Sequence, residues 1–173
     1  MLQLCRKAST RPLALEEGRG EASLTLSFED RRKSRLRTHL DDGREVGVLL
    51  PRGSILHEGD YLLDRDEKVL VAIKATVETL SVVRTADRQH LARAAYHLGN
   101  RHVPLQVGPD WLAYEHDHVL DDMVRALDLA VVVEQRPFEP EPGGYSHGHH
   151  EDPTGGMDSH EQHPDPREHH HER

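Results

Sequence analysis

Apolar residues alternate with polar ones between residues 22 and 75, as expected when strands bury one face and expose the other. The alternation is clearest at Leu24, Leu26 and Phe28, and again at Val69, Val71 and Ile73. Between these positions, apolar segments at residues 36–40 and 46–50 flank Asp41-Asp42-Gly43, a sequence typical of a hairpin turn. The pattern predicts a small all-β domain over residues 1–75.

The pattern changes after residue 76, where apolar positions recur at helical spacing in two segments. In chain order, we predict a strand at residues 80–83, a helix at 87–98, strands at 104–107 and 112–115, a helix at 118–127 and a strand at 130–134. This β-α-β-β-α-β order is that of ferredoxin-like folds. The predicted fold class is therefore α+β, with a ferredoxin-like domain over residues 76–142 following the β domain. Trp111 and Tyr114 are expected to fill core or interface volume.

Both predicted helices carry signals at their ends. The first should end where Gly99 or Asn100 supplies a residue in the left-handed conformation. The second should begin after Asp117, whose short acidic side chain can cap the first free amide groups. The apolar stripe of this second helix comprises Val119, Leu120, Met123 and Leu127.

Three histidines stand at the ends of these elements. His102 lies on a loop just past the first helix, and His116 and His118 flank the corner between a strand and the second helix. A neutral imidazole suits zinc, copper, iron or nickel, so the spacing alone leaves the metal open. His97 lies off the apolar stripe of its helix and is expected to be a surface or packing residue.

Residues 143–173 show no hydrophobic periodicity and are rich in His, Glu, Asp, Gly and Pro, so we expect a disordered tail. More than half of the 15 histidines of the chain lie there: His147, His149, His150, His160, His163, His169, His170 and His171. They are spread among acidic residues and do not form one uninterrupted run. This distribution favours a metal-binding tract over an expression tag.

The formal net charge is −9, and most of it lies after Phe138, where nine acidic residues are offset by only two arginines. The rest of the chain is nearly neutral, without the basic face that a nucleic-acid-binding protein needs. The single cysteine, Cys5, cannot form an internal disulfide, which fits a reducing compartment. No apolar segment is long enough to span a bilayer, and no phosphate-binding loop is present. We therefore expect a cytoplasmic protein that binds neither membrane nor nucleic acid.

Longer motifs give a specific family resemblance. Residues 96–102 (YHLGNRH), Gln106 and residues 117–123 (DHVLDDM) closely resemble the UreE family of urease accessory proteins. The similarity continues upstream through residues 35–37 (RLR), 42–45 (DGRE), 50–53 (LPRG) and 59–60 (GD), and it covers about residues 20–142. One departure is Asp128, which stands where the family usually has a glycine after the second helix, so that turn is expected to differ.

The resemblance implies a nickel metallochaperone, which carries Ni(II) as cargo for assembly of the urease active site. It implies a homodimer in which His102 meets its two-fold mate at a nickel site, with His116 and His118 as a subsidiary site. The β domain would be the so-called peptide-binding domain. The implied partners are other urease accessory proteins, including the GTPase component, and through them the urease apoprotein. Zn(II) and Cu(II) would be competing metals.

Two alternatives belong to other classes of function. In the first, the protein is a nickel or zinc store in which the histidine-rich tail binds all the metal and the folded part only tethers it. In the second, His116, His118 and an acid such as Asp117 form a metallohydrolase site, although the spacing fixes neither a third ligand nor a general base. We expect a protein that is not an enzyme.

Overall fold

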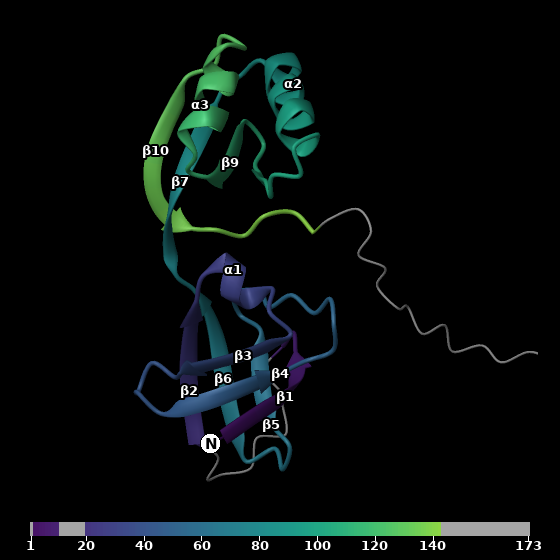
Figure 1. Ribbon diagram of the computed structural model, residues 1–173, viewed down its shortest axis with the longest axis vertical. Coiled ribbons are helices and arrows are strands. Elements are labelled where there is room, and N and C mark those ends of the chain that lie inside the picture. The colour runs from purple at the N-terminus through teal and green to yellow at the C-terminus, as the bar shows by residue number, and fades with distance from the viewer. Residues whose placement is uncertain (1, 11–19, 143–173) are drawn as a thin grey trace, which may run out of the picture.

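The computed structural model describes residues 2–10 and 20–142 of the chain. Within them, ten strands form two sheets, and three helices accompany the sheets. The fold is therefore mixed α+β and consists mostly of strands. Figure 1 shows the two sheets as stacked bodies joined through the connection between β6 and β7. The helix α1 and the segment that follows β10 lie between them.

The first sheet has six strands in the order β2-β6-β5-β1-β4-β3. Its strands are β1 (Leu2–Ala8), β2 (Gly20–Leu26), β3 (Arg35–His39), β4 (Glu45–Leu49), β5 (Tyr61–Asp64) and β6 (Val69–Ala75). The predicted hairpin is confirmed, because β3 and β4 pair in antiparallel register from Arg35 opposite Leu49 to His39 opposite Glu45. The predicted last strand is confirmed as β6. The strands β1 and β5 were not predicted.

The prediction that Phe28 continues an alternating strand is wrong. The chain turns at Ser27, whose hydroxyl accepts a hydrogen bond from the amide of Asp30 at 3.2 Å and so caps the short helix α1 (Phe28–Arg31). The Ser27 hydroxyl supplies an acceptor for an amide that would otherwise lack a partner in the first turn, which favours a helix that begins at Phe28. The Phe28 ring instead packs edge-on against Phe138, with 5.4 Å between the ring centroids.

The second sheet has four strands in the order β10-β7-β9-β8, and every neighbouring pair is antiparallel. Its elements are β7 (Val77–Arg84), α2 (Arg88–Gly99), β8 (Gln106–Val107), β9 (Trp111–Glu115), α3 (His118–Arg125) and β10 (Val131–Pro137). The order matches the predicted succession. The bounds differ most at β7, which begins three residues earlier than predicted, at Val77, and at β10, which runs to Pro137.

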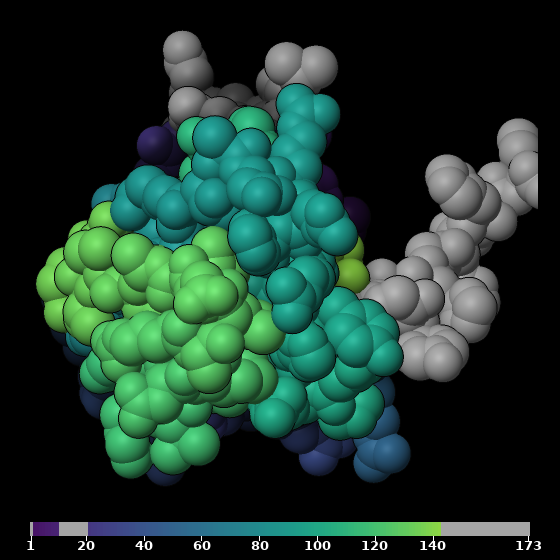
Figure 2. Space-filling model, turned by 90° about the horizontal axis from the view of Figure 1, so that it is seen from above, coloured from purple at the N-terminus to yellow at the C-terminus, as the bar shows by residue number. Residues whose placement is uncertain are grey.

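Each face of the four-stranded sheet has its own apolar layer. The helices α2 and α3 cover one face through a cluster that includes Leu98, Tyr114 and Val124, and they form the end of the molecule seen in Figure 2. Phe138 covers the other face together with Phe28 of α1. The expected packing role of Tyr114 is confirmed, because its ring is fully buried. None of the helices in the described residues is both long and apolar enough to cross a membrane.

A buried arginine joins α1 to the segment that follows β10. The Arg31 side chain is 0% exposed, and its guanidinium donates to the carbonyls of Leu56 and Phe138 and to the carboxylate of Glu139. Glu139 also accepts from the backbone amide of Glu58 at 3.1 Å and lies 3.0 Å from Nδ1 of His57. The chain after β10 is thus fixed to the six-stranded sheet.

Candidate functional site

His102 ends helix α2 in the left-handed conformation, with a φ of 58°. Its amide donates to the carbonyl of Gly99 at 2.9 Å, and the next amide, of Val103, donates back to Leu98 at 3.3 Å. This pair of bonds is a Schellman motif with His102 at the position that glycine usually occupies. The prediction that Gly99 or Asn100 supplies the left-handed residue is therefore wrong.

The helix end explains why His102 takes this conformation. Leu98 is fully buried, and Val103 packs against the same cluster, which is the apolar contact that usually accompanies a Schellman motif. The position of Val103 fixes the backbone of the residue before it. In the described part of the chain, the His102 imidazole makes no hydrogen bond or ion pair. Its ring nitrogens are therefore available to a ligand.

His116 is held by its neighbours. It follows β9, and its amide donates to the carbonyl of Thr79 at 3.1 Å. Its ring nitrogen Nδ1 lies 3.0 Å from Oγ of Ser81 and 3.3 Å from Oδ2 of Asp121. The side chain is 39% exposed, and His116 lines a cavity at the surface.

Asp121 is a carboxylate on α3 whose side chain is only 1% exposed. The Tyr114 hydroxyl donates to its Oδ1 at 2.8 Å, and the Arg125 guanidinium lies 3.6 Å from its Oδ2. Burial raises the pKa of the Tyr114 hydroxyl, and the hydrogen bond to Asp121 raises it further, so this hydroxyl stays a donor. The sequence analysis did not single out Asp121 and so missed its place beside His116.

The predicted N-cap of α3 is confirmed. Oδ1 of Asp117 accepts from the amides of Val119 at 2.7 Å and Leu120 at 3.2 Å, and these bonds lower the pKa of the Asp117 carboxyl. Because Oδ1 of Asp117 caps the helix, it is less available as a metal ligand, which weakens the metallohydrolase hypothesis. Within the described residues, the His118 imidazole makes no hydrogen bond or ion pair. The predicted stripe is wrong at Val119, which is 62% exposed; Asp121 and Val124 are buried instead.

The turn after α3 differs from expectation in an informative way. Asp128 adopts a φ of 61°, which is the left-handed conformation that a glycine would supply at little cost. Aspartate tolerates this region better than most residues do. The aspartate therefore keeps a glycine-like turn at this position.

Two cavities meet at His102. One, of about 410 Å³, is lined by His102, Val103, His116 and Asp117 among others, so it brings two of the three predicted histidines to one opening. The other, of about 480 Å³, lies between His102 and the six-stranded sheet and is lined by Phe28, Glu141 and Pro142 among others. In the described residues, no three His, Cys, Asp or Glu side chains of one chain are grouped closely enough to hold a metal ion.

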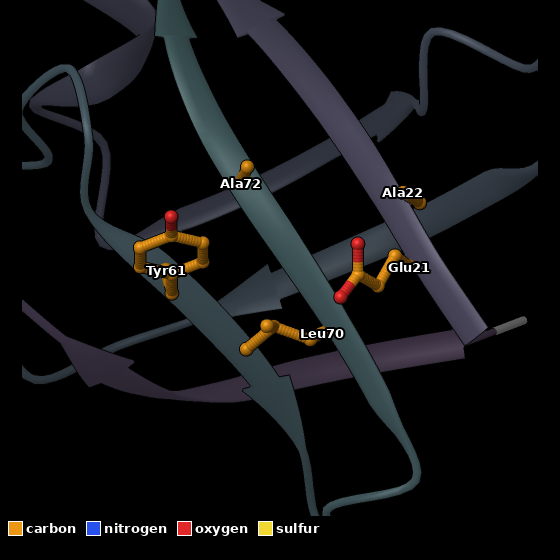
Figure 3. A pocket seen from close by; sticks show the side chains of 5 residues that line it. All are labelled: Glu21, Ala22, Tyr61, Leu70 and Ala72. Atoms are coloured by element: carbon orange, nitrogen blue, oxygen red, sulfur yellow. The ribbon is translucent and has the colours of Figure 1, made fainter. Parts of the chain in front are cut away.

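Of the remaining candidates, His97 lines neither of these two cavities. The His97 ring contacts the Tyr96 ring edge-on on α2, in keeping with the expectation of a surface or packing residue. The eight histidines of the tail, from His147 to His171, lie outside the described residues. A third, smaller cavity lies on the six-stranded sheet (Figure 3) and is lined by Glu21, Ala22, Tyr61, Leu70 and Ala72. It contains no histidine.

Two family matches cover most of the chain. Residues 13–76 match the family described as UreE urease accessory protein, N-terminal domain, and residues 78–172 match its C-terminal domain. The second match extends into the histidine-rich tail.

Several curated relatives named urease accessory protein UreE are similar to this chain. The Alkalilimnicola ehrlichii protein is 61% identical over 125 residues, which cover 72% of this chain and 76% of the relative. A Pseudomonas putida protein is 56% identical over 130 residues, with coverages of 73% and 79%. The Escherichia coli O157:H7 protein is 47% identical over 155 residues, with coverages of 88% and 97%. The chain therefore belongs to the UreE family of urease accessory proteins.

Proposed function

We propose that this protein is a nickel metallochaperone that captures Ni(II) and delivers it for assembly of the urease active site. Family membership supports the urease context. The observation that carries the proposal is His102, an imidazole held on a left-handed residue without a partner in the described part of its own chain. A conformation that is costly for a non-glycine residue is retained where the side chain has a task.

The principal site would lie between two copies of the chain. One His102 offers a single nitrogen, and no group of three ligands forms within the described residues of one chain. A structural metal site is closed and saturated by its ligands, whereas two facing imidazoles leave coordination positions open. A partner could take the ion from such a site. The protein would accordingly be a homodimer, with water or tail histidines completing the coordination.

His116 and His118 would form a subsidiary site, and the eight histidines of the tail would capture the metal. Pro142 and Glu141, the last described residues, line the same cavity as His102, so the tail would begin beside the principal site. Tethered ligands raise the local concentration of binding groups without new contacts in the fold. Zn(II) and Cu(II) would compete, because both also accept imidazole nitrogen.

The finer architecture is part of the same proposal. Residues 1–75 would form the peptide-binding type of domain, residues 76–142 a ferredoxin-like domain for dimerisation and metal binding, and residues 143–173 the tail. The succession of β7 to β10 with two helices on one face supports the second assignment. The partners would be other urease accessory proteins, including the GTPase component, and the urease apoprotein, in the cytoplasm. The protein would bring about no reaction of its own.

A histidine-rich store of nickel or zinc is the second candidate, favoured by the eight histidines that follow residue 143. Equilibrium dialysis with nickel, on the full chain and on residues 1–142, separates the two. The shorter chain keeps every described element and the bond from the Glu141 amide to Leu105. We expect it to retain one ion per dimer, and His102→Ala to remove that ion. Loss of all binding on shortening would favour the store.

The dimer is tested without metal by sedimentation. We expect the metal-free full chain to sediment as a dimer at micromolar concentration, because a single His102 is a poor site and its mate must come from a second copy. Matched runs of His102→Ala separate dimerisation from metal bridging, since packing alone should keep that variant dimeric. A monomer at micromolar concentration would exclude the interfacial site.

A further inference from the structure

His116 and His118 are close in sequence, yet their surroundings differ. Nδ1 of His116 faces both the Ser81 hydroxyl and the Asp121 carboxylate, whereas His118 has no such contact in the described residues. An imidazole has two ring nitrogens, and the hydrogen bond made by one decides which of them carries the proton. The neighbours of His116 therefore influence its tautomer.

The Ser81 hydroxyl is hydrogen-bonded to Nδ1 of His116 at 3.0 Å, and the buried Asp121 carboxylate lies at an ion-pair distance of 3.3 Å from the same nitrogen. A carboxylate accepts and does not donate, so Asp121 needs donors around it when it is removed from water. The Tyr114 hydroxyl supplies one donor, at Oδ1. Arg125 is near Oδ2 but at 3.6 Å, which leaves room for Nδ1–H of His116 as a second donor to that oxygen.

Ser81 supports the same assignment. Its Oγ lies within 3.0 Å of Nδ1, and Ser81 also interacts with the Tyr114 hydroxyl. A serine hydroxyl can accept from Nδ1–H while it donates to the tyrosine oxygen. Ser81 is fully buried on β7, so water does not compete for these positions. Both neighbours of Nδ1 can therefore act as hydrogen-bond acceptors toward Nδ1–H.

We infer that Asp121 is a positioning residue that holds His116 in the Nδ1–H tautomer and turns its Nε2 lone pair toward the metal. Ligating histidines commonly donate their second ring nitrogen to a carboxylate, which fixes tautomer and ring orientation. His116 is accordingly the oriented ligand of the subsidiary pair, and His118 the adaptable one. This inference rests on the proposed role of His116 as a nickel ligand.

The tautomer is tested first, without metal, by ¹⁵N NMR of the imidazole rings in the full chain. The expected result for the native protein is a protonated Nδ1 and a bare Nε2 at His116. In Asp121→Asn the amide would present NH₂ to Nδ1, and the ring should shift to the Nε2–H form. The matched control is Asp122→Asn, because Asp122 is its exposed neighbour on α3 and pairs with Arg125. A native His116 with its proton on Nε2 would overturn the inference, whatever the variants do.

Nickel chloride then provides the second readout. Titrated into the full chain, nickel should broaden the His116 ring signals, and Asp121→Asn should require about 10- to 100-fold more nickel for the same effect. Asp122→Asn should behave as the native protein does. Equal nickel responses in Asp121→Asn and the native chain would refute the positioning role. A native His116 that ignores nickel would instead refute the proposed subsidiary site, while the tautomer result would stand by itself.

Discussion

His102 and His116 open onto one cavity but are held in opposite ways. His102 has a constrained backbone and a side chain without partners in the described residues, whereas His116 has its ring fixed by Ser81 and Asp121. A free imidazole adjusts to whatever completes its site, and a fixed one presents a single nitrogen in one direction. The difference indicates that His102 depends on a second molecule, and that His116 is prepared by its own chain.

The two histidines also depend on different parts of the fold. The direct partners of His116 come from β7 and α3, and β9 supplies Tyr114, which donates to Asp121. All of them belong to the four-stranded sheet and its helices. The cavity on the other side of His102 is bounded by Phe28 of α1, Ile55 of the segment between β4 and β5, and Pro142 after β10, and therefore by segments attached to both sheets. Its shape relies on the contact between Arg31 and Glu139. Changes that separate the sheets should therefore reach His102 before His116.

Glu139→Ala should cause the largest loss of stability among these variants, and it should affect His102 and not His116. It leaves the fully buried Arg31 without its charged partner, and Nε of Arg31 already lacks a hydrogen bond. Removing one partner of a buried ion pair typically costs about 3–5 kcal/mol. We expect a loss of this order in urea denaturation, with changed NMR signals around His102 and an unchanged His116 tautomer.

The matched control for that change is Glu141→Ala. Glu141 is exposed and contributes its backbone amide, which the substitution keeps, to Leu105. Its free energy of unfolding should stay within about 0.5 kcal/mol of the native value. If Glu139→Ala is as mild as this control, the contact between Arg31 and Glu139 does not hold the segment after β10.

Tyr114→Phe should affect the surroundings of His116 and leave those of His102 unchanged. The ring remains to fill its buried volume, but Asp121 loses the hydroxyl that donates to it at 2.8 Å. An unsatisfied buried acceptor costs about 1–3 kcal/mol, and more when it is charged. We expect that loss in urea denaturation, together with altered His116 ring signals and unaltered His102 signals. A variant as stable as the native protein would mean that Asp121 finds another donor.

His102→Gly, compared with His102→Ala, distinguishes the role of the imidazole as a ligand from the strain of the left-handed backbone. A glycine adopts the φ of 58° without strain, so this variant should be about 1 kcal/mol more stable than His102→Ala. Both variants should lose the tightest nickel ion. Asp128→Gly is the matched control, because Asp128 has a φ of 61° at the end of α3 and should tolerate glycine in the same way while keeping that ion. Equal stability of His102→Gly and His102→Ala would show that the left-handed residue carries no strain.

Much of the fold follows from the local pattern of apolar and polar residues. The two strands that were not predicted, β1 and β5, show where this pattern is insufficient. The hairpin of β3 and β4 and the cap at Asp117 were predicted because turn and cap signals act within a few residues. Strand β1 was missed because its register shifts between Leu4 and Arg6, which breaks the alternation. Strand β5 was missed because Leu62 and Leu63 are both buried, so neither face of this central strand is polar.

The site divides in the same way. Sequence spacing and family resemblance marked His102, His116 and His118, and the cavity that two of them share is a product of the fold. Asp121 could not be distinguished from an ordinary acid in the first turn of a helix, because its burial depends on Tyr114 and therefore on another element. The left-handed His102 was hidden by Gly99, a stronger local signal three residues earlier, which is the last residue of α2 and does not have a positive φ.

Acid should weaken the helix that leads to His102 by a small amount. Asp87 caps α2, and hydrogen bonds from the backbone amides of His90 and Gln89 lower the pKa of its carboxyl. Because the pKa is lower in the folded than in the unfolded chain, the carboxylate contributes its full stability above the ordinary value of about 3.9. That contribution is lost as the pH falls through this value toward the folded pKa.

Asp87→Asn keeps a good capping residue that does not titrate. Between pH 5 and 3, the free energy of unfolding of the native chain should therefore fall relative to that of Asp87→Asn, as measured by urea denaturation at each pH. Parallel pH curves would mean that the cap at Asp87 does not stabilise the helix that carries His102.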